Sequence, residues 1–232
     1  MGTLYTHTSD KPNTFFAPAW KFYFYEAQLE DTKILEELKN VVLMKEKEII
    51  KNFPEMQNDG GTGLGPNSLT SKFLKFNIFN WKEDSCIVFQ NFVRSEYKKF
   101  IDLLAENDSE FIRENNTYVA GWANVLRRGQ RMSEHWHSCT PNSYLGAHFC
   151  VSTSNTSTIY VNPFNKKDLI EFKNSPGKLL FFQNYMVHYT TEHKTDDERI
   201  TLAMDIFTEK DYNDRVQKSA TQRAPERSVR FV

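Results

Sequence analysis

The segment PGKLLFFQNYMVHYTTEH, residues 176–193, indicates the fold class of the chain. Its apolar run 178–182 is bounded by Pro-Gly before it and by Gln183-Asn184 after it, a pattern that predicts a buried β-strand ending in a short turn. His188 follows shortly after that turn. A histidine at the end of a buried strand can present its imidazole to a metal, so the stretch predicts a sheet protein with one candidate metal ligand.

Two further histidines lie upstream in Glu134-His135-Trp136-His137. The alternation of a strand would place both imidazoles on one side of the chain and Trp136 on the other, so that one cation could bind both. Together with His188 they form a candidate three-histidine site. Neutral imidazole suits iron, zinc, copper and nickel alike, so these ligands alone do not determine the metal.

Downstream, residues 196–207 form a charged turn that runs into a strand, with Arg199 and Thr201 on the same face. A planar guanidinium binds a carboxylate through two hydrogen bonds, and a hydroxyl beside it can assist. This pair predicts an anionic co-substrate near the metal. The alternative is a surface ion pair between Arg199 and the acidic residues 196–198, which would contribute at most about 1 kcal/mol.

The order of these motifs resembles the iron(II)/2-oxoglutarate-dependent oxygenases, and more narrowly their prolyl-hydroxylase-like branch, including proteins of tailed phages of marine bacteria. The resemblance covers about residues 117–207. The segments that carry it are WANVLRRGQRMSEHWHS, YLGAHFCV, PGKLLFFQNYMVHYTTEH and DERITLAMDI. It implies a mainly β fold, a double-stranded β-helix (jelly roll, cupin-like) with N-terminal helices flanking the major sheet. It also implies hydroxylation of a substrate with Fe(II), 2-oxoglutarate and O2, releasing succinate and carbon dioxide.

By the same resemblance, His135 and His188 are the two histidine ligands of iron. His137 occupies the position where that family usually carries an aspartate or glutamate ligand, so the chain departs from the common motif there. Three-histidine iron sites also support oxygen chemistry, and we expect His137 to be the third ligand.

The resemblance assigns the distal carboxylate of 2-oxoglutarate to Arg199 and Thr201. The family often has a tyrosine that contacts 2-oxoglutarate where this chain has Cys150. His148 lies on the same face by the period of a strand, and we expect it to take over that contact. No catalytic residue is expected beyond these metal and co-substrate ligands.

Two other classes of function fit parts of the pattern. Three histidines with a bound water are the ligand set of zinc hydrolase-type enzymes. Arg199 with Thr201 argues against that reading, since a hydrolase has no general need for a carboxylate receptor there. The second alternative is a non-catalytic β-barrel that serves as a binding or virion-associated module, because fold does not determine function.

Elsewhere, apolar spacing predicts a helix over 31–52, strands over 73–81 and 86–92, and a helix over 95–106 with Ser95 as its cap. The glycine-rich stretch 58–67 reads as a flexible connector, with a cover over the site as the alternative. His193 is expected to be a solvated loop residue. The aromatic residues proposed as apolar walls of the pocket are Trp122, Phe149, Phe181 and Phe182.

Composition predicts one domain over residues 1–232, with a support region (1–116), a β-helix core (117–208) and a polar, loosely docked C-terminal extension (209–232). The basic residues of that extension are Arg215, Lys218, Arg223, Arg227 and Arg230.

The 29 basic and 30 acidic residues balance, which predicts neither nucleic-acid nor membrane binding. The three cysteines Cys86, Cys139 and Cys150 lack metal-type spacing, which indicates a reduced cytoplasm, that of the host if a phage encodes the chain. The primary substrate, a protein or a small molecule, cannot be read from the sequence; peptidyl groups, proline first, are the starting candidates.

Overall fold

The computed structural model describes residues 2–55, 58–218 and 227–232. Its helices and strands, in chain order, are β1 (Thr3–Thr8), β2 (Lys21–Gln28), α1 (Thr32–Asn52), η1 (Thr70–Lys72), η2 (Ile78–Asn80), α2 (Asp84–Asn107), β3 (Thr117–Leu126), β4 (Leu145–Ser152), β5 (Ser157–Asn162), β6 (Asn165–Lys173), β7 (Lys178–Gln183), β8 (Val187–Thr190), β9 (Arg199–Thr208), α3 (Glu209–Lys218) and β10 (Val229–Arg230).

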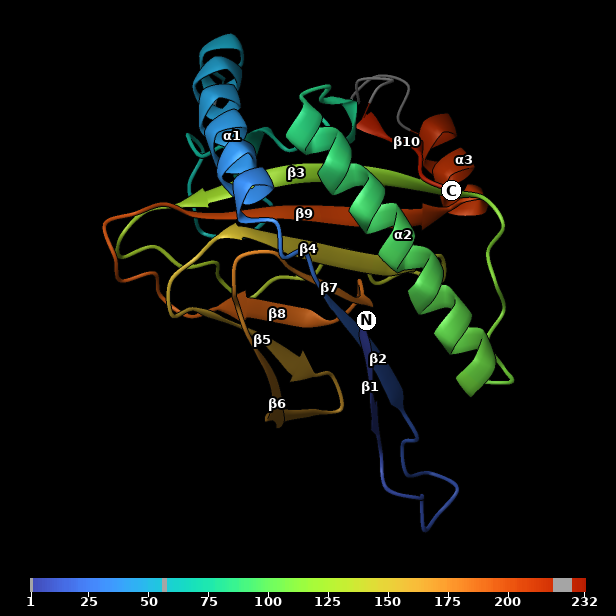
Figure 1. Ribbon diagram of the computed structural model, residues 1–232. Helices are drawn as coiled ribbons and strands as arrows, with labels where there is room; N and C mark the ends of the chain where they lie inside the picture. Colours follow the sequence, from blue (N-terminus) through green and yellow to red (C-terminus); the bar gives the residue numbers. More distant parts are fainter. Residues whose placement is uncertain (1, 56–57, 219–226) are drawn as a thin grey trace.

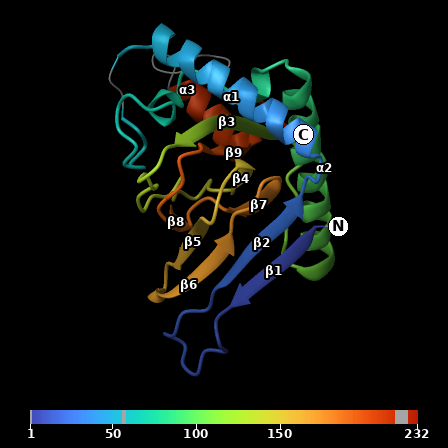
Figure 2. The ribbon, with the colours of Figure 1, turned by 60° about the vertical axis from the view of Figure 1, so that its left-hand side comes forward.

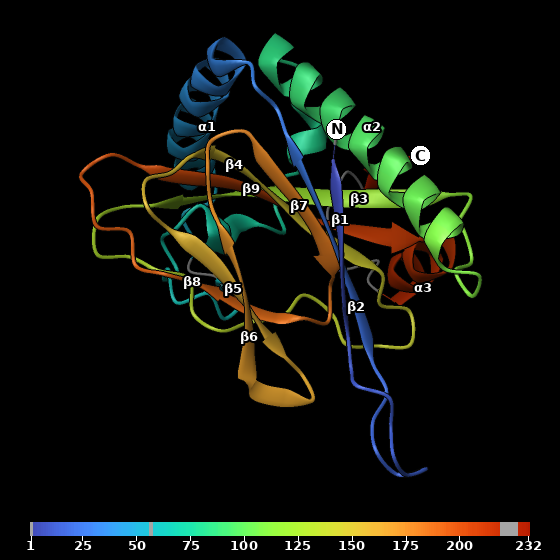
Figure 3. The ribbon, with the colours of Figure 1, turned by 60° about the horizontal axis from the view of Figure 1, so that its bottom comes forward.

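The strands form two antiparallel sheets, which lie in two layers (Figure 1). The larger sheet has the order β1-β2-β7-β4-β9-β3-β10, and the smaller has the order β6-β5-β8. Helices α1 and α2 lie on one side of the larger sheet, and the smaller sheet lies on the other (Figure 3). The expected mainly β architecture with flanking N-terminal helices is therefore present.

The long strands of the larger sheet divide their side chains between two layers, as the period of two requires. In β7, Leu179 and Phe181 pack in the core under the helices, whereas Leu180 and Phe182 pack between the sheets. Strand β9 follows the same rule. Its residues 200, 202, 204 and 206 are apolar and lie in the helix-side core. Its residues 199, 201, 203 and 205 line a pocket on the other face.

Helix α1 begins as predicted, with the Asp31 carboxylate accepting hydrogen bonds from the backbone N–H groups of residues 33 and 34. Helix α2 differs from the prediction. The expected strand over 86–92 is its first half, and Ser95 is inside it rather than at its cap. Buried Cys86, Phe89, Val93 and Phe100 recur at helical spacing along one face, and their burial against the sheet outweighs the strand propensity of this stretch.

The expected strand over 73–81 is also wrong, because this stretch contains only the short 3-10 turn η2 and irregular chain. Strands β1 and β2 were not predicted from the sequence. These two strands pair as a hairpin at the edge of the larger sheet (Figure 2). Phe22 and Phe24 of β2 are fully buried in the layer between the sheets, so β2 belongs to the core, whereas β1 is a largely exposed edge strand.

The C-terminal extension is more firmly attached than predicted. Strand β10 pairs with β3, and Phe231 is buried in the helix-side core. Its neighbour Arg227 is buried above the rings of Phe73 and Trp122. Arg223 lies outside the described residues, as do the side chains of residues 215 and 218. Among the helices that the structure describes, none is both long enough and apolar enough to cross a membrane.

Candidate metal centre

Residues 127–144, between β3 and β4, bring His135 and His137 alongside β8. His135 and His188 exchange both backbone hydrogen bonds, at 3.0 and 2.9 Å, and so form an isolated antiparallel bridge. The His137 backbone N–H donates to the carbonyl of Asn184 at 3.0 Å. The segment is therefore extended but is not a strand of either sheet. As expected, the two histidine side chains lie together, while Trp136 between them is 58% exposed.

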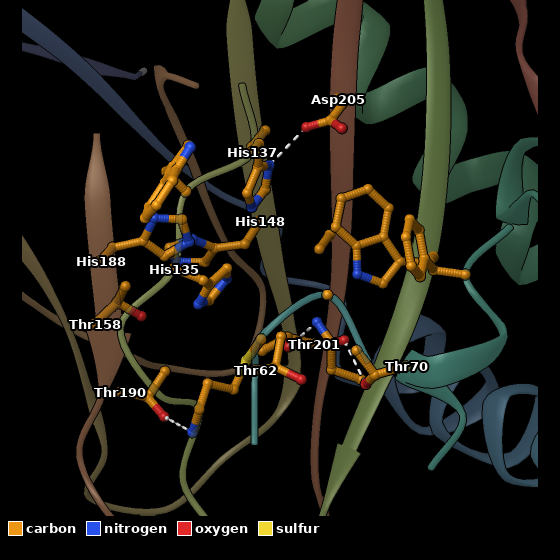
Figure 4. A pocket seen from close by; sticks show the side chains of 18 of the residues that line it. Thr62, Thr70, His135, His137, His148, Thr158, His188, Thr190, Thr201 and Asp205 are labelled. Carbon is orange, nitrogen blue, oxygen red and sulfur yellow. Dashed lines mark hydrogen bonds and ion pairs between the residues drawn. The ribbon is translucent and has the colours of Figure 1, made fainter. Parts of the chain in front are cut away.

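The side chains of His135, His137 and His188 converge on one point (Figure 4). One ring nitrogen from each lies within 4.8 Å of the others. In each ring Nδ1 has an acceptor: the carbonyl of Ser133 at 2.7 Å for His135, that of Met186 at 2.9 Å for His188, and the Asp205 carboxylate at 2.6 Å for His137. These contacts favour a proton on Nδ1, which leaves each Nε2 lone pair available to a metal.

Burial keeps two of these imidazoles neutral. It lowers the pKa of His135 to about 4, with the neighbouring His137 adding to the effect. It lowers the pKa of His188 well below its ordinary value. Neutral nitrogens are the form that coordinates a cation, so His135 and His188 can bind a divalent metal without first losing protons at neutral pH.

Arg199 lies in the same pocket and is only 1% exposed. Its Nε donates to the hydroxyl of Thr156 at 3.1 Å, whereas a terminal nitrogen, Nη1, has no partner among the described residues. No acidic side chain in the described part of the chain pairs with this guanidinium, so the predicted alternative of a surface ion pair is wrong. Burial lowers the pKa of Arg199, but an arginine keeps its proton in a protein. A buried cation without an acid partner fits the carboxylate of a ligand.

Thr201 lies two residues along β9 on the same face and is also buried. Its hydroxyl accepts from the Asn124 amide at 3.5 Å, and that amide's oxygen accepts from the hydroxyl of Thr70 at 2.8 Å. Arg199 and Thr201 thus project into one pocket as predicted.

His148, on β4, points into the pocket as well. Burial and the nearby Arg199 lower its pKa to about 3, so this imidazole is neutral. Its Nδ1 lies 3.3 Å from the hydroxyl of Tyr160, and its buried Nε2 has no partner among the described residues. The structure therefore leaves one hydrogen-bonding nitrogen of His148 open toward the pocket that also holds Arg199.

The pocket that contains all six of these side chains has a volume of about 220 Å³. Trp122 and Phe182 line it as predicted. Phe149 and Phe181 do not, because their positions in β4 and β7 point to the helix-side core. Strand alternation separates Phe181 from Phe182 and so decides which aromatic faces the site.

The glycine-rich stretch is a structured wall of the pocket rather than a free connector. Asp59, Gly60 and Thr62 line the pocket. The Asp59 carboxylate accepts from the backbone N–H groups of Gly61 at 3.1 Å and Gly65 at 2.9 Å. The carbonyl of Thr62 accepts from the backbone N–H of Ser133 at 2.7 Å, which links this stretch to the segment that carries His135.

The prediction for His193 is wrong, because this histidine is completely buried. Its Nε2 lies 2.5 Å from the carbonyl oxygen of Asp197, and its backbone exchanges hydrogen bonds with the turn at 129–130. It lies in a loop as expected, but the loop folds back onto the end of β3 and excludes water from the ring. His193 is absent from the metal cluster.

Among the partners of the site residues that were not predicted from the sequence are Thr156 and Asp205. Thr156, in the turn before β5, holds Arg199, and nothing in its local sequence indicates this contact. Asp205 bonds His137, and it could have been found, because it lies on β9 in phase with Arg199 and Thr201.

No protein-family model matches the sequence, and no curated protein matches it. Solved structures do match. AviO1 from Streptomyces viridochromogenes Tue57 is 12% identical with a TM-score of 0.53, over 80% of this chain and 90% of that one. SnoN, a non-haem α-ketoglutarate-dependent epimerase from nogalamycin biosynthesis, is 9% identical with a TM-score of 0.50, over 80% and 76%.

A viral collagen prolyl hydroxylase from Paramecium Bursaria Chlorella virus-1 also matches, at 14% identity over 80% of this chain and 95% of that one, with a TM-score of 0.45. The matches also include an oxidoreductase of the 2OG-Fe(II) oxygenase family from Burkholderia pseudomallei and a prolyl-4-hydroxylase from Pseudomonas putida, with TM-scores of 0.36 and 0.44. At these identities the likeness shows the fold alone. It confirms the predicted mainly β jelly-roll fold with flanking helices.

Proposed function

We propose that this protein is an iron(II)- and 2-oxoglutarate-dependent dioxygenase that hydroxylates a substrate still to be identified and releases succinate and carbon dioxide. The observation that carries the proposal is the buried Arg199, which has an open Nη1 and no acid partner among the described residues, in the same pocket as three converging imidazoles. A metal cluster alone would fit many functions. A carboxylate receptor in the same pocket narrows the choice to a metal enzyme with an anionic co-substrate.

Each side chain has a defined task in this proposal. His135, His137 and His188 would hold Fe(II) through Nε2. Arg199 and Thr201 would bind the distal carboxylate of 2-oxoglutarate, and that carboxylate would satisfy the open Nη1. When bound, iron and the oxo acid together supply the oxidation of a C–H bond by O2.

The remaining pocket residues shape the environment of that chemistry. His148 offers its open Nε2 as a further hydrogen bond to the co-substrate. Trp122 and Phe182 would supply apolar walls to the pocket. The expectation of a peptidyl substrate, with proline as the first candidate, stays a prediction from the sequence resemblance.

The zinc-hydrolase alternative uses the same three imidazoles, and a bound metal alone would not distinguish it. It leaves Arg199 unexplained, because the water-activating chemistry of zinc gives no reason to bury a free guanidinium beside the metal. A non-catalytic β-barrel module leaves both the cluster and Arg199 unexplained.

The test is the visible absorption spectrum of metal-free protein under anaerobic conditions, first with Fe(II) and then with 2-oxoglutarate. Chelation of iron by the oxo acid gives a charge-transfer band and needs no primary substrate. We expect the band in the wild type, its loss in Arg199→Ala at the same 2-oxoglutarate concentration, and its retention in Arg128→Ala. Arg128 is an exposed arginine paired with Asp196, and so it controls for loss of positive charge.

The outcomes separate the three functions. Iron binding without the band would favour the zinc-type site, and absence of any metal binding would favour the non-catalytic module. If the band forms in Arg199→Ala at the same half-saturating 2-oxoglutarate concentration as in the wild type, the role given to the guanidinium is contradicted.

A further inference from the structure

His137 differs from the other two clustered histidines in the partner of its Nδ1. His135 and His188 face neutral backbone carbonyls. His137 faces the carboxylate of Asp205, at 2.6 Å between Nδ1 and Oδ1, and the two side chains are only 5% and 16% exposed. A hydrogen bond to a carboxylate in such a shielded place is shorter and stronger than one to a neutral carbonyl. Asp205 thus bonds His137, the one histidine of the three at the position where the oxygenases that this sequence resembles usually carry a carboxylate ligand.

The sheet is built to allow this contact. Asp205 of β9 lies opposite Gly146 of β4 in the antiparallel register. A Cβ at position 146 would lie 2.7 Å from Cζ of Phe182 and 3.4 Å from Nδ1 of His137. The missing side chain leaves room for the imidazole to lie against the sheet, where the neighbouring strand presents Asp205. Figure 4 shows the carboxylate on the side of the His137 ring that faces away from the other two histidines.

We propose that Asp205 is a positioning residue of the metal centre that acts through His137. It fixes the proton on Nδ1 and keeps Nε2 directed at the metal, and it makes the imidazole a stronger donor. It also returns to the site the negative charge that the histidine at 137 removes, one hydrogen bond further from the metal. The proposal rests on the metal site of the proposed function, but it is independent of the co-substrate and of the reaction.

Two substitutions separate charge from hydrogen bonding. Asp205→Asn keeps the size and an acceptor oxygen but removes the charge, whereas Asp205→Ala removes both. Asp196→Asn is the matched control, because it deletes an exposed carboxylate on the turn before β9. The probe is Co(II) alone, whose visible spectrum reports its coordination and whose affinity is measured by competition with a chelating dye.

We expect Co(II) to bind most tightly to the wild type and to Asp196→Asn, less tightly to Asp205→Asn and least tightly to Asp205→Ala. Loss of such a partner weakens metal binding by about 10- to 100-fold. An Asp205→Asn affinity indistinguishable from that of the wild type would overturn the proposal. That result would leave the charge-transfer band of the wild type intact, so the proposed function would survive. Absence of Co(II) binding in the wild type would instead defeat the metal site itself.

A double substitution tests whether the effect passes through His137. In a His137→Asp background the carboxylate ligand is direct and the contact with Asp205 is gone. Adding Asp205→Asn to that background should therefore leave the Co(II) affinity unchanged or raise it. A loss as large as in the wild-type background would show that Asp205 acts by another route and would refute the proposal.

A measurement on the unmodified protein covers the case in which the Asp205 variants do not fold. The 15N imidazole spectrum of the Zn(II)-loaded wild type reports which nitrogen of each histidine carries the proton. We expect His137 to be protonated on Nδ1, with its Nε2 shifted by the metal. A proton on Nε2 of His137 in the loaded protein would overturn the assignment.

Discussion

Replacing Arg199 with methionine should stabilise the protein in the absence of ligand and abolish its response to 2-oxoglutarate. The guanidinium is fully buried and has no acid partner among the described residues, so its desolvation is offset only by the hydrogen bond to Thr156. Methionine fills most of the same space without a charge. The substitution therefore removes the unfavourable desolvation free energy of the buried guanidinium, which a bound carboxylate offsets in the wild type.

The size of the change can be estimated from the contacts. Replacing a buried ionic group with an apolar one stabilises proteins by up to about 4 kcal/mol. Losing the Thr156 hydrogen bond costs about 1 kcal/mol, and the Thr156 hydroxyl keeps its contacts with Thr153 and Asn174. The net gain is about 1–3 kcal/mol, which corresponds to a rise in Tm of about 2–10 °C for a chain of this size.

The ligand should stabilise the wild type much more than Arg199→Met. At a concentration about 100 times its Kd, a ligand that binds only the folded state adds about 2.7 kcal/mol to the stability of the Co(II)-loaded wild type. Removing one partner of a desolvated charge pair costs about 2–5 kcal/mol of binding free energy, which is a loss of more than about 20-fold in affinity. Arg199→Met should therefore gain little or nothing from the same ligand.

Thermal unfolding of the two Co(II)-loaded proteins, with and without 2-oxoglutarate, measures both effects. Arg128→Met serves as the control, because that arginine is exposed and should change neither quantity. A lower Tm for ligand-free Arg199→Met would refute the argument from an uncompensated buried charge. An undiminished rise on adding 2-oxoglutarate would refute its role as the carboxylate receptor.

Three other changes give further predictions. Gly146→Ala should weaken Co(II) binding in a dye competition, because its Cβ would meet Phe182 and the His137 ring; unchanged affinity would show that the sheet can yield there. Phe231→Ala should lower the free energy of unfolding in urea by about 3–5 kcal/mol, since the ring is buried in the helix-side core; a loss under about 1 kcal/mol would restore the view of a loosely docked tail. Asp59→Ala removes the acceptor that organises the glycine-rich stretch, and should alter the coupling of 2-oxoglutarate turnover to substrate while leaving Fe(II) affinity unchanged; loss of iron binding would contradict this.

The parts of the fold that sequence predicted well are those whose periodicity is long and regular. The helix over 31–52 and the strands around residues 178–182 and 199–207 fall in this class. The first half of α2 was misread because Ile87, Val88 and the aromatic residues after them have high strand propensity. The helical spacing of its buried face becomes clear only when the whole of 84–107 is taken as one segment.

The sequence predicted which side chains lie together in the pocket, but not the partners that those side chains contact. Local patterns placed Arg199 and Thr201 on one face and the three histidines in a plausible order. Whether Arg199 meets an acidic residue depends on the turns before β5 and β9, and the burial of His193 depends on a loop folding back onto β3. The bond from His137 to Asp205 spans 68 residues and depends on the path of residues 127–144, which no short-range pattern determines.

The position of β9 between β3 and β4 determines when this architecture can be completed. Strands β3 and β4 follow each other along the chain. In the larger sheet, however, each pairs with β9 and not with the other. During synthesis both must wait with open edges until residues 199–208 have left the ribosome. Such long-range pairing slows folding and exposes strand edges to aggregation. We therefore expect nascent chains that end before residue 199 to need chaperone protection, and the histidine cluster to gain its rigid support only after β9 has inserted.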